Sequence, residues 1–246
     1  MTQEPLMEKF NKLLIAPTGI LRIAINLGNP VLARKDGQDK LSGVSVELAK
    51  LFAEYVSLPY TLIPFNAAGK VFESLEENLW DLAFLANEPK RAEKIAFSRP
   101  YVIIEGTYLV KKDSNFNTVS DLDRAGIKIS VGKGAAYDLF LSRTLEHAEL
   151  IRTDTSESAI NYFVEGNVNA AAGIRQPLFR TSNTYSGFRV LNDSFTQIKQ
   201  AMAVPREREY SAEIVDAFLV GQLESGQINR LFDLDGQSDI CIPNVT

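Results

Sequence analysis

The sequence predicts an α/β protein built from mostly parallel sheets with helices packed against them. Apolar runs of strand length alternate along the chain with segments whose apolar residues recur at helical spacing, which is the pattern of β-α-β units. A chain of 246 residues with 45% hydrophobic residues can bury one large core or two smaller ones. The alternation and the length together predict one or two layered α/β domains.

The first hundred residues contain the signals of three strands and two helices. The expected strands are residues 21–26, 61–65 and 82–85, and the expected helices are an apolar stripe from Val44 to Tyr55 and the segment 70–78. Pro64 lacks an amide donor, so its strand either ends early or lies at the edge of a sheet. The order strand, helix, strand, helix, strand is that of a parallel sheet.

A second α/β unit is expected from about residue 113 onward. Its strands are predicted at 127–131, 149–152 and 168–174, and its helices at 135–143 and 154–163. Asp154 and Glu157 form the pattern of a capping box at the start of the latter helix. Beyond this unit, we expect a short helix with Pro177 in its first turn, a polar surface loop at 181–187 and a packed helix at 211–223.

Charge and composition exclude several classes of function. The chain has 26 basic and 31 acidic residues, a net charge of −5, so no broad basic field is expected to attract nucleic acid or anionic lipid. The single cysteine, Cys241, cannot form an intramolecular disulfide, and the single histidine, His147, cannot build a histidine metal cluster. We therefore expect no metal, no cofactor and no histidine-based catalytic triad.

The start of the chain and its hydropathy bear on membranes. Residues 1–16 lack the basic start and the uninterrupted apolar stretch of a secretory signal. No run of about 18 or more apolar residues occurs, so the chain is not expected to insert into a membrane.

The most informative segment leads from an apolar strand into a single arginine. Ligands of open α/β sheets bind beyond the carboxyl ends of the strands, and Asn87 and Arg91 follow the expected strand 82–85 at that place. Arginine offers a rigid two-pronged donor that matches a carboxylate. We interpret Arg91 as a clamp for a ligand carboxylate, with an ordinary solvated arginine beside Glu88 or Glu93 as the alternative.

Four segments, in order, resemble the signatures of the family 3 extracellular solute-binding proteins. Residues 81–101 are similar to "D-a-(strand)-T-x-x-R-A-(x)3-F-S-x-P-Y", residues 21–26 to the family's first strand, residues 43–49 to "G-F-D-V-D-L-A", and residues 121–137 to "D-L-k-G-k-x-I-g-V-x-x-G-t-t-y". Members of this family capture amino acids and related small acids for membrane transporters. The resemblance implies that Arg91 holds the α-carboxylate of the ligand.

The resemblance also implies a two-lobed clamshell of the type 2 periplasmic-binding-protein kind, each lobe a mostly parallel sheet flanked by helices. Lobe 1 would comprise residues 1–105 plus 202–246 and lobe 2 residues 106–201, with hinge crossings near 103–107 and 197–204. The ligand would bind in the cleft between the lobes of a monomer, which would serve the membrane permease of an ABC transporter. The compartment stays open, because a member whose signal peptide has been removed is periplasmic and a complete chain of this sequence would be cytoplasmic.

Further polar residues are nominated as ligand contacts beside Arg91. Family members carry small hydroxyl residues before the matching arginine, whereas here Asn87 is the polar candidate in that stretch. The turn Gly134-Ala135-Ala136 precedes an expected helix, where free amides and the helix dipole favour an anion. An ordinary tight turn is the alternative for this segment.

The ends of two other strands supply four more candidates. Asn26 and Asn29 follow the first expected strand, and Phe65 and Asn66 end the next one, at the same expected rim. Each of these residues either faces the cleft or serves only the turn in which it lies.

Ile174 stands where the family's amino-acid binders have an aspartate that holds the ammonium group of the ligand. The resemblance therefore implies that the usual ammonium anchor is absent. Arg175, with the adjoining Gln176, adds a cation that suggests a ligand with a second acidic or carbonyl group, unless Arg175 points outward. Glu105, at the first crossing, is the acid nominated to replace the lost partner of the ammonium group.

Three classes of function follow from these residues. The first is a binding protein for a small carboxylate-bearing solute, an amino acid or a related organic acid. The second is an enzyme similar to the cyclohexadienyl dehydratases, which act on prephenate or arogenate and need an acid in the cleft, for which Glu105 is the candidate. The third is a ligand-sensing module that acts in trans. We expect a binding protein and not an enzyme.

Overall fold

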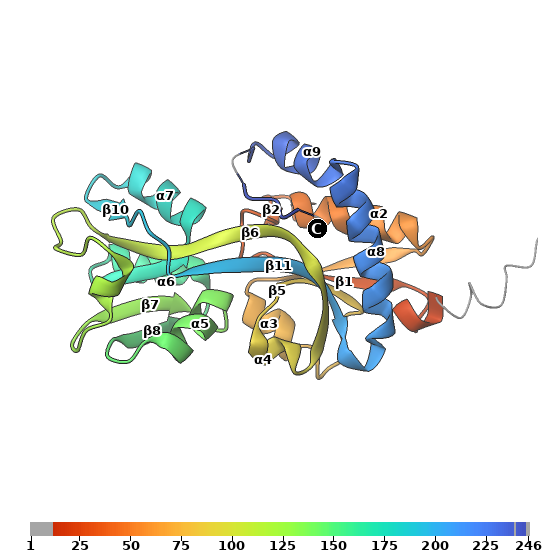
Figure 1. Cartoon of the computed structure of the whole chain (residues 1–246), viewed down its shortest axis with the longest axis horizontal. Coiled ribbons are helices and arrows are strands. Elements are labelled where there is room, and N and C mark those ends of the chain that lie inside the picture. Colours follow the sequence, from red (N-terminus) through yellow and green to blue (C-terminus); the bar gives the residue numbers. More distant parts are fainter. Residues whose placement is uncertain (1–11, 239, 245–246) are drawn as a thin grey trace, which may run out of the picture.

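Two long strands run lengthwise through the molecule between two groups of helices and strands (Figure 1). The computed structural model describes residues 12–238 and 240–244, so most of the segment on which the secretory-signal expectation rests, residues 1–11, lies outside the described residues. The two long strands are β6 (Ile95–Lys111) and β11 (Thr196–Pro205). They pair antiparallel in a register that extends from Thr196 opposite Gly106 to Pro205 opposite Ile95.

The main sheet has the strand order β4-β1-β5-β11-β6-β9-β7-β8, with β10 paired to β6. The remaining strands of this sheet are β1 (Leu21–Asn26), β4 (Tyr60–Phe65), β5 (Leu82–Ala86), β7 (Lys128–Gly132), β8 (Glu149–Thr153), β9 (Ala170–Ile174) and β10 (Phe188–Val190). Strand β1 pairs parallel with β4 and β5, and β7 pairs parallel with β8 and β9. The predicted α/β fold with mostly parallel sheets is thus confirmed, and β6 and β11 add antiparallel pairs at its centre.

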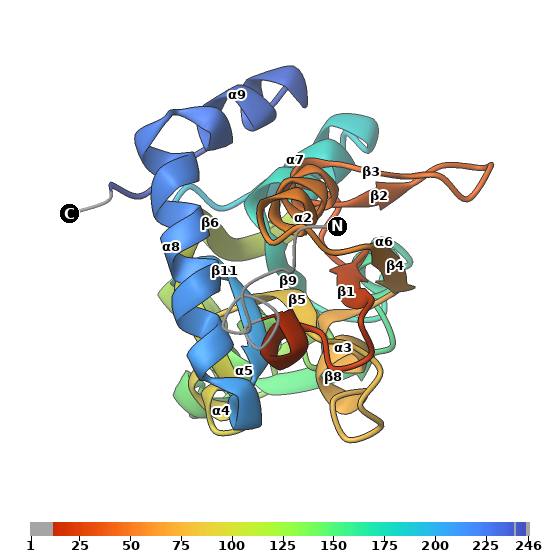
Figure 2. The same cartoon turned by 90° about the vertical axis from the view of Figure 1, so that its right-hand side faces the viewer.

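The helices divide between the two groups of strands (Figure 1). Around β1, β4 and β5 are α2 (Val44–Tyr55), α3 (Ala68–Glu73), α4 (Pro89–Ala92), α8 (Tyr210–Glu224) and α9 (Gln227–Leu234). Around β7, β8 and β9 are α5 (Ala136–Thr144), α6 (Ser156–Val164) and α7 (Arg175–Thr184). Helix α8 stands at the end of the molecule remote from the second group (Figure 2). Smaller elements are the hairpin β2 (Arg34–Lys35) and β3 (Leu41–Ser42) and the 3-10 turns η1 (Val119–Leu122) and η2 (Arg206–Arg208).

Buried aromatic residues hold the first group of helices against the sheet. The rings of Phe52 in α2 and Phe218 in α8 meet edge to face with centroids 5.2 Å apart. Both side chains are buried, as is Phe232 of α9. Burial of such large apolar side chains stabilises the fold by about 1.5–3 kcal/mol each, so these contacts help to fix α2, α8 and α9 against the sheet.

Three of the local predictions need correction. The helix predicted at 70–78 ends at Glu73, because the hydroxyl of Ser74 and the indole N–H of Trp80 both donate to the carbonyl oxygen of Val71. The capping residue of α6 is Thr155 and not Asp154, and its partner is Ser158. The predicted loop 181–187 begins with four helical residues, since α7 extends to Thr184.

Two threonine hydroxyls lie along the part of α7 that was not predicted. Thr181 and Thr184 each donate a hydrogen bond to the carbonyl oxygen four residues earlier in the helix, at 3.2 and 2.9 Å. These polar side chains therefore bond to the helix itself.

The prediction for Pro64 is confirmed, since β4, the strand that contains it, is the edge strand of the main sheet.

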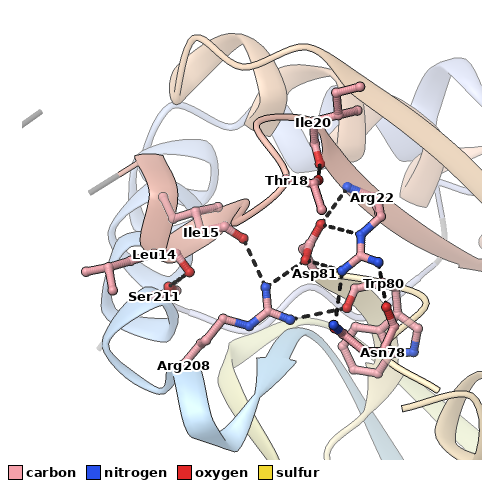
Figure 3. A network of polar contacts seen from close by, with 10 residues as sticks. All are labelled: Leu14, Ile15, Thr18, Ile20, Arg22, Asn78, Trp80, Asp81, Arg208 and Ser211. Atoms are coloured by element: carbon pink, nitrogen blue, oxygen red, sulfur yellow. Dashed lines mark hydrogen bonds and ion pairs between the residues drawn. The ribbon is translucent and has the colours of Figure 1, made fainter. Parts of the chain in front are cut away.

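A buried carboxylate ties the start of β5 to its surroundings (Figure 3). The side chain of Asp81 has no exposed surface and pairs with Arg22 Nη2 at 2.8 Å and Arg208 Nη1 at 2.7 Å. Burial alone raises the pKa of Asp81, but hydrogen bonds from Arg22 and Arg208 outweigh burial and hold that pKa below its ordinary value. Asp81 thereby joins β1, β5 and η2 at the end of β5 opposite to Arg91.

Within residues 12–238 and 240–244, no helix combines the length and the apolar character needed to cross a bilayer.

Candidate functional site

A small cavity lies where the ends of β1 and β5 meet the first turns of α5 and α6. We call it the inner cavity, and its volume is about 30 Å³. The first group of elements contributes Asn26, Gly28, Asn29, Ala67, Ala68, Ala86 and Arg91 to its lining. The rest of the lining is Gly132, Lys133, Ala135, Ala136, Tyr137, Thr155, Ser156, Ile174, Ile198 and Gln200. This volume has room for a group of a few heavy atoms, such as a carboxylate.

Arg91 is the buried cation of the inner cavity. Its side chain lies on the short helix α4, which begins with Pro89 and is capped by Glu88, whose carboxylate accepts a hydrogen bond from the Lys90 amide at 3.0 Å. Burial lowers the pKa of Arg91 from 12.5 to about 10, against the opposing charge of Glu88. The guanidinium therefore remains protonated at neutral pH, and it is only 1% exposed.

The guanidinium of Arg91 is only partly satisfied by the protein. Nη1 donates to the carbonyl oxygen of Ala86 at 3.1 Å, and Nη2 donates to the carbonyl oxygen of Gly134 at 2.9 Å. Nε is buried and has no hydrogen-bond partner in the described residues. A buried donor without an acceptor is costly, by about 1–3 kcal/mol or more for a charged group. Arg91, a lining residue of the inner cavity, thus has a buried donor nitrogen without an acceptor in the described residues.

Asn29, which lines the same cavity, has a second donor without an acceptor in the described residues. Its side chain is 3% exposed, and Oδ1 accepts a hydrogen bond from the Val31 amide at 3.2 Å. Its Nδ2 group is buried and has no acceptor in the part of the chain that the structure describes. Two buried donors of this kind at one cavity are suited to the oxygen atoms of an anion.

The first turn of α6 adds positive potential from the opposite side. Thr155 and Ser156 line the inner cavity, and the first amides bonded at this helix end are those of Ser158 and Ala159. The amides of Ser156 and Glu157 therefore stand at the open end of the helix, where the dipole favours an anion. The helix approaches closely because residue 132 is glycine.

Gly132 is required for that close approach. A Cβ atom on Gly132 would lie 2.7 Å from the amide nitrogen of Ser156. The hydroxyl of Tyr137 completes the contact, since it donates to Ser156 Oγ at 2.8 Å and accepts from the Gly132 amide at 3.3 Å. Burial of this side chain raises the pKa of Tyr137, against the opposing effect of both hydrogen bonds. Tyr137 stays neutral at physiological pH and holds α6 against β7.

A larger outer cavity of about 630 Å³ adjoins the inner one. The two share Gly28, Tyr137, Thr155, Ser156 and Ile174. The outer cavity is further lined by Leu27, Pro30, Asn66, Glu157, Ile160, Asn161, Gly173, Pro177, Arg180 and Thr181. Its volume falls in the range of small-molecule sites, about 300–1,000 Å³. A solute whose carboxylate enters the inner cavity would therefore leave its remaining atoms in the outer one.

The group of elements around β1, β4 and β5 also contacts the group around β7, β8 and β9 directly, near Gly69 and Gly134. A Cβ atom on Gly69, in α3, would lie 2.9 Å from the carbonyl oxygen of Lys133 and 3.3 Å from Gly134 Cα. Gly134 has a φ of 72°, a conformation that glycine adopts readily. An ion pair between Glu88 and Arg143 spans the same side. Figure 1 shows α5 facing α3 and α4 across this contact.

Several predicted site residues come together here. Asn26, Asn29, Arg91, Ala135 and Ala136 line the inner cavity, and Asn66 lines the outer one. Asn26 also serves its turn, because its Oδ1 accepts from the Gly28 amide at 2.9 Å.

Gly134 takes part in a different way from the one predicted. Its amide donates to Asp138 Oδ2 at 2.8 Å, and the amide of Ala135 donates to the carbonyl oxygen of Gly132 at 3.1 Å. These two amides are therefore used inside the turn and are not available to an anion. The carbonyl oxygen of Gly134 instead accepts from Arg91.

The remaining nominated residues lie away from both cavities. Asn87 is exposed, and its backbone amide bonds to Lys199. Phe65 packs against the apolar cluster around Trp80. Gln176 lines neither cavity, and its Oε1 atom is buried without a partner among the described residues.

Arg175 and Glu105 form an ion pair with each other, and neither residue lines the inner or the outer cavity. Nε of Arg175 donates to Glu105, while its other nitrogens donate to the carbonyl oxygens of Leu191, Asn192 and Asp193. Nε thus faces Glu105 in β6, and the two terminal nitrogens face the segment that leads from β10 into β11. Arg175 thus holds the segment 191–193 beside β6. The guanidinium that was predicted to bind the ligand is used in these contacts within the protein.

Sequence reasoning missed several lining residues. Thr155 and Ser156 follow β8 and begin a helix, so the rule that led to Arg91 applies to them as well. Lys133 follows β7 in the same way. Gln200 and Ile198 lie in β11, whose presence at the cavity depends on pairing with distant strands and has no local signal.

No cluster of three or more histidine, cysteine, aspartate or glutamate residues suited to a metal ion occurs among the residues described.

Comparisons with known proteins agree on the kind of protein. A profile of the bacterial extracellular solute-binding proteins, family 3, matches residues 21–233. The L-cystine-binding protein TcyJ of Escherichia coli is 22% identical over 216 residues, which cover 87% of this chain and 81% of that protein. The solved structure of the cysteine-binding protein from Campylobacter jejuni superposes with a TM-score of 0.80 at 19% identity, covering 96% of this chain and 99% of that one.

A second solved structure is relevant to the enzyme alternative. The ancestral amino acid-binding protein AncCDT-1, a precursor of cyclohexadienyl dehydratase, superposes with a TM-score of 0.75 at 21% identity. The match covers 89% of this chain and 96% of that one. At this identity the likeness shows the fold alone, which is the type 2 periplasmic-binding-protein fold predicted from the sequence.

Proposed function

Because the chain belongs to family 3 of the bacterial extracellular solute-binding proteins, we propose that it captures a small carboxylate-bearing solute in the cleft between two lobes. The observation that carries this proposal is the pair of buried donors without acceptors, Arg91 Nε and Asn29 Nδ2, at one cavity. A carboxylate would accept from both donors and from the open end of α6. The solute then occupies the outer cavity with its remaining atoms.

The proposed lobes keep the boundaries expected from the sequence. Lobe 1 is residues 1–105 plus 202–246, of which 1–11, 239 and 245–246 lie outside the described residues, and lobe 2 is residues 106–201. Two features support this division. The parallel strand pairs occur within each group of elements, and β6 and β11 pass from one group to the other as an antiparallel pair in which Glu105 lies opposite Gln197. Bending of these two strands would open the cleft.

The proposed solute is an acid that lacks an amine. In the described residues, the lining of the inner cavity contains Arg91 and Lys133 but no carboxylate. Ile174, at the place of the family's ammonium anchor, lines both cavities. An ammonium group buried there without a counter-charge would be strongly disfavoured. Relatives whose names state cystine or cysteine binding make amino acids the competing class.

The partner in this proposal is the permease of an ABC transporter. A solute that contacts both lobes stabilises the closed form by its differential affinity for that form. A permease that recognises the closed form would then receive loaded protein only. A membrane-bound sensor that reads the same closed form is the alternative, and it would use the same site.

Binding, and not catalysis, is proposed despite the similarity to AncCDT-1. Dehydration of a cyclohexadienyl substrate needs an acid that can donate a proton at the bound substrate. The candidate nominated for that role, Glu105, is paired with Arg175 and lines neither cavity. Glu157 is the one carboxylate that lines the outer cavity among the described residues, and it is exposed.

A thermal-shift screen of amino acids, 2-oxo acids, dicarboxylates and aromatic acids tests the proposed function. A solute present at about 100 times its Kd stabilises the native state by about 2.7 kcal/mol, so its midpoint shift is easily measured. We expect at least one acid to raise the midpoint in the wild type but not in Arg91→Ala. If no acid does so at millimolar concentration, the protein is not a receptor for small carboxylates.

Closure of the cleft should depend on Gly69. In Gly69→Ala, the new methyl group would meet the backbone of Lys133 and Gly134, although alanine favours the helix in which residue 69 lies. We expect solute binding at least tenfold weaker, with an unchanged or higher thermal midpoint in the absence of solute. Titration calorimetry gives the affinity, and small-angle scattering should show a smaller solute-induced decrease in radius of gyration than in the wild type.

Gly37→Ala is the matched control for that variant. A Cβ atom on Gly37 meets nothing within 4 Å. Binding by Gly37→Ala should therefore equal that of the wild type. Wild-type affinity in Gly69→Ala as well would mean that the contact between residues 69 and 134 plays no part in closure.

A further inference from the structure

Arg180 is an exposed arginine at the outer cavity, and no acidic side chain of the described residues pairs with it. It lies in α7 and lines the outer cavity, where Glu157 is the one other charged residue in the described lining. Its guanidinium makes no hydrogen bond or ion pair with any residue in the described ranges. Other arginines nearby are bound: Arg175 pairs with Glu105 at the start of the same helix, and Arg34 pairs with Asp235.

A second positive charge, that of Arg34, acts on the exposed Arg180. Partial burial lowers the pKa of Arg180, and the positive charge of Arg34 lowers it further. Asp235, which could have compensated both cations, accepts hydrogen bonds from Arg34 and from Gln237. An isolated cation beside a second cation is a local conflict of the kind that occurs at binding sites. An anion in the outer cavity would remove this conflict.

The two cavities form one continuous site for a solute with charges at both ends. They share five lining residues, and apolar side chains of Ile160, Ile174 and Pro177 line the outer part. A solute held by its first carboxylate at Arg91 and Asn29 would place a short carbon chain against this apolar wall. Its far end would then lie in the cavity that Arg180 lines.

We propose that Arg180 binds a second anionic group of the solute, so that the solute is a short dicarboxylic acid or an equivalent dianion. This inference rests on the proposed function and specifies its substrate class. It transfers to Arg180 the role that the sequence suggested for Arg175. The bond would be a charge-assisted hydrogen bond from a guanidinium to a carboxylate at the open end of the site.

Matched acids test the role of Arg180 by titration calorimetry. The probes are 2-oxoglutarate with 2-oxopentanoate and 2-oxoadipate with 2-oxohexanoate, pairs in which a terminal carboxylate replaces a methyl group. We expect the wild type to bind the dicarboxylate of at least one pair at least tenfold more tightly than its partner. In Arg180→Gln this preference should fall below threefold, while the affinity for the monocarboxylate changes by less than twofold.

Arg230→Gln is the control for the loss of one positive charge. Arg230 lies exposed on α9 and lines neither cavity. We expect Arg230→Gln to keep the full preference for dicarboxylates. Equal binding of both members of each pair by the wild type, or a tenfold preference that survives in Arg180→Gln, would overturn this inference and leave the proposed function standing. Absence of binding by all four acids would overturn this inference as well, while the proposed function would fall only if no acid of the thermal-shift screen binds.

Discussion

Replacement of Arg91 by alanine is expected to weaken solute binding at least 100-fold. The variant removes the buried cation of the inner cavity, whose Nε has no acceptor in the described residues. The loss of a charge-assisted hydrogen bond to a buried carboxylate costs about 1.5–3 kcal/mol, and the desolvated carboxylate that remains adds to that cost. Titration calorimetry with the solute that gives the largest thermal shift measures the effect.

The fold should survive this substitution. Arg91 is a buried cation whose protein partners are two carbonyl oxygens, so its removal also relieves the desolvation of a charge. We expect an unchanged circular dichroism spectrum. Asn87→Ala is the control, because Asn87 is exposed and lines neither cavity. An affinity of Arg91→Ala within threefold of the wild type, a difference below about 0.7 kcal/mol, would show that the solute does not bind at Arg91.

The second large effect concerns stability. Asp81→Asn should lower the free energy of unfolding by about 3 kcal/mol, because it leaves Arg22 and Arg208 without their buried counter-charge. Urea unfolding at neutral pH measures the change. Glu76→Gln is the control: the ion pair of Glu76 with Lys94 is exposed, so this variant should unfold like the wild type.

The pH dependence of this effect has a definite sign. The pKa of Asp81 is lower in the folded protein than its ordinary value of 3.8. Its stabilising contribution is therefore complete above the unfolded pKa and is lost as the pH falls through the folded pKa. The difference between the wild type and Asp81→Asn should be constant from pH 7 to about pH 5 and should shrink below pH 4. A difference that grows on acidification would contradict the role of the arginine pairs.

Much of the fold was predictable because its parallel units carry local signals. Strand β1 and helix α2 follow the expected apolar patterns, and the arginine after β5 lies at the cavity as the rule for parallel sheets predicts. The long strand β6 was not predicted as one element. It contains Pro100 and Gly106, which interrupt a strand pattern, and it is continuous because β11, β9 and β10 pair along it.

The side chains of the site were harder to predict than its backbone. Arg175 follows β9 as Arg91 follows β5, yet its guanidinium bonds to Glu105, which lies 70 positions earlier. The direction of a long side chain depends on such distant partners, which sequence spacing does not contain. Arg180, one helical turn and a half further along α7, has no such partner in the described residues and lines the outer cavity instead.

The account depends most on one property of the site, which is that it binds the carboxylate of a solute without an anchor for an amine. Titration calorimetry of the wild type with glutamate against 2-oxoglutarate, and with phenylalanine against phenylpyruvate, tests this property directly. We expect any member that binds to be the 2-oxo acid, with at least a tenfold lower Kd than its amino acid, because no carboxylate in the described lining of the inner cavity compensates an ammonium group. Tighter binding of the amino acid in either pair would contradict the account.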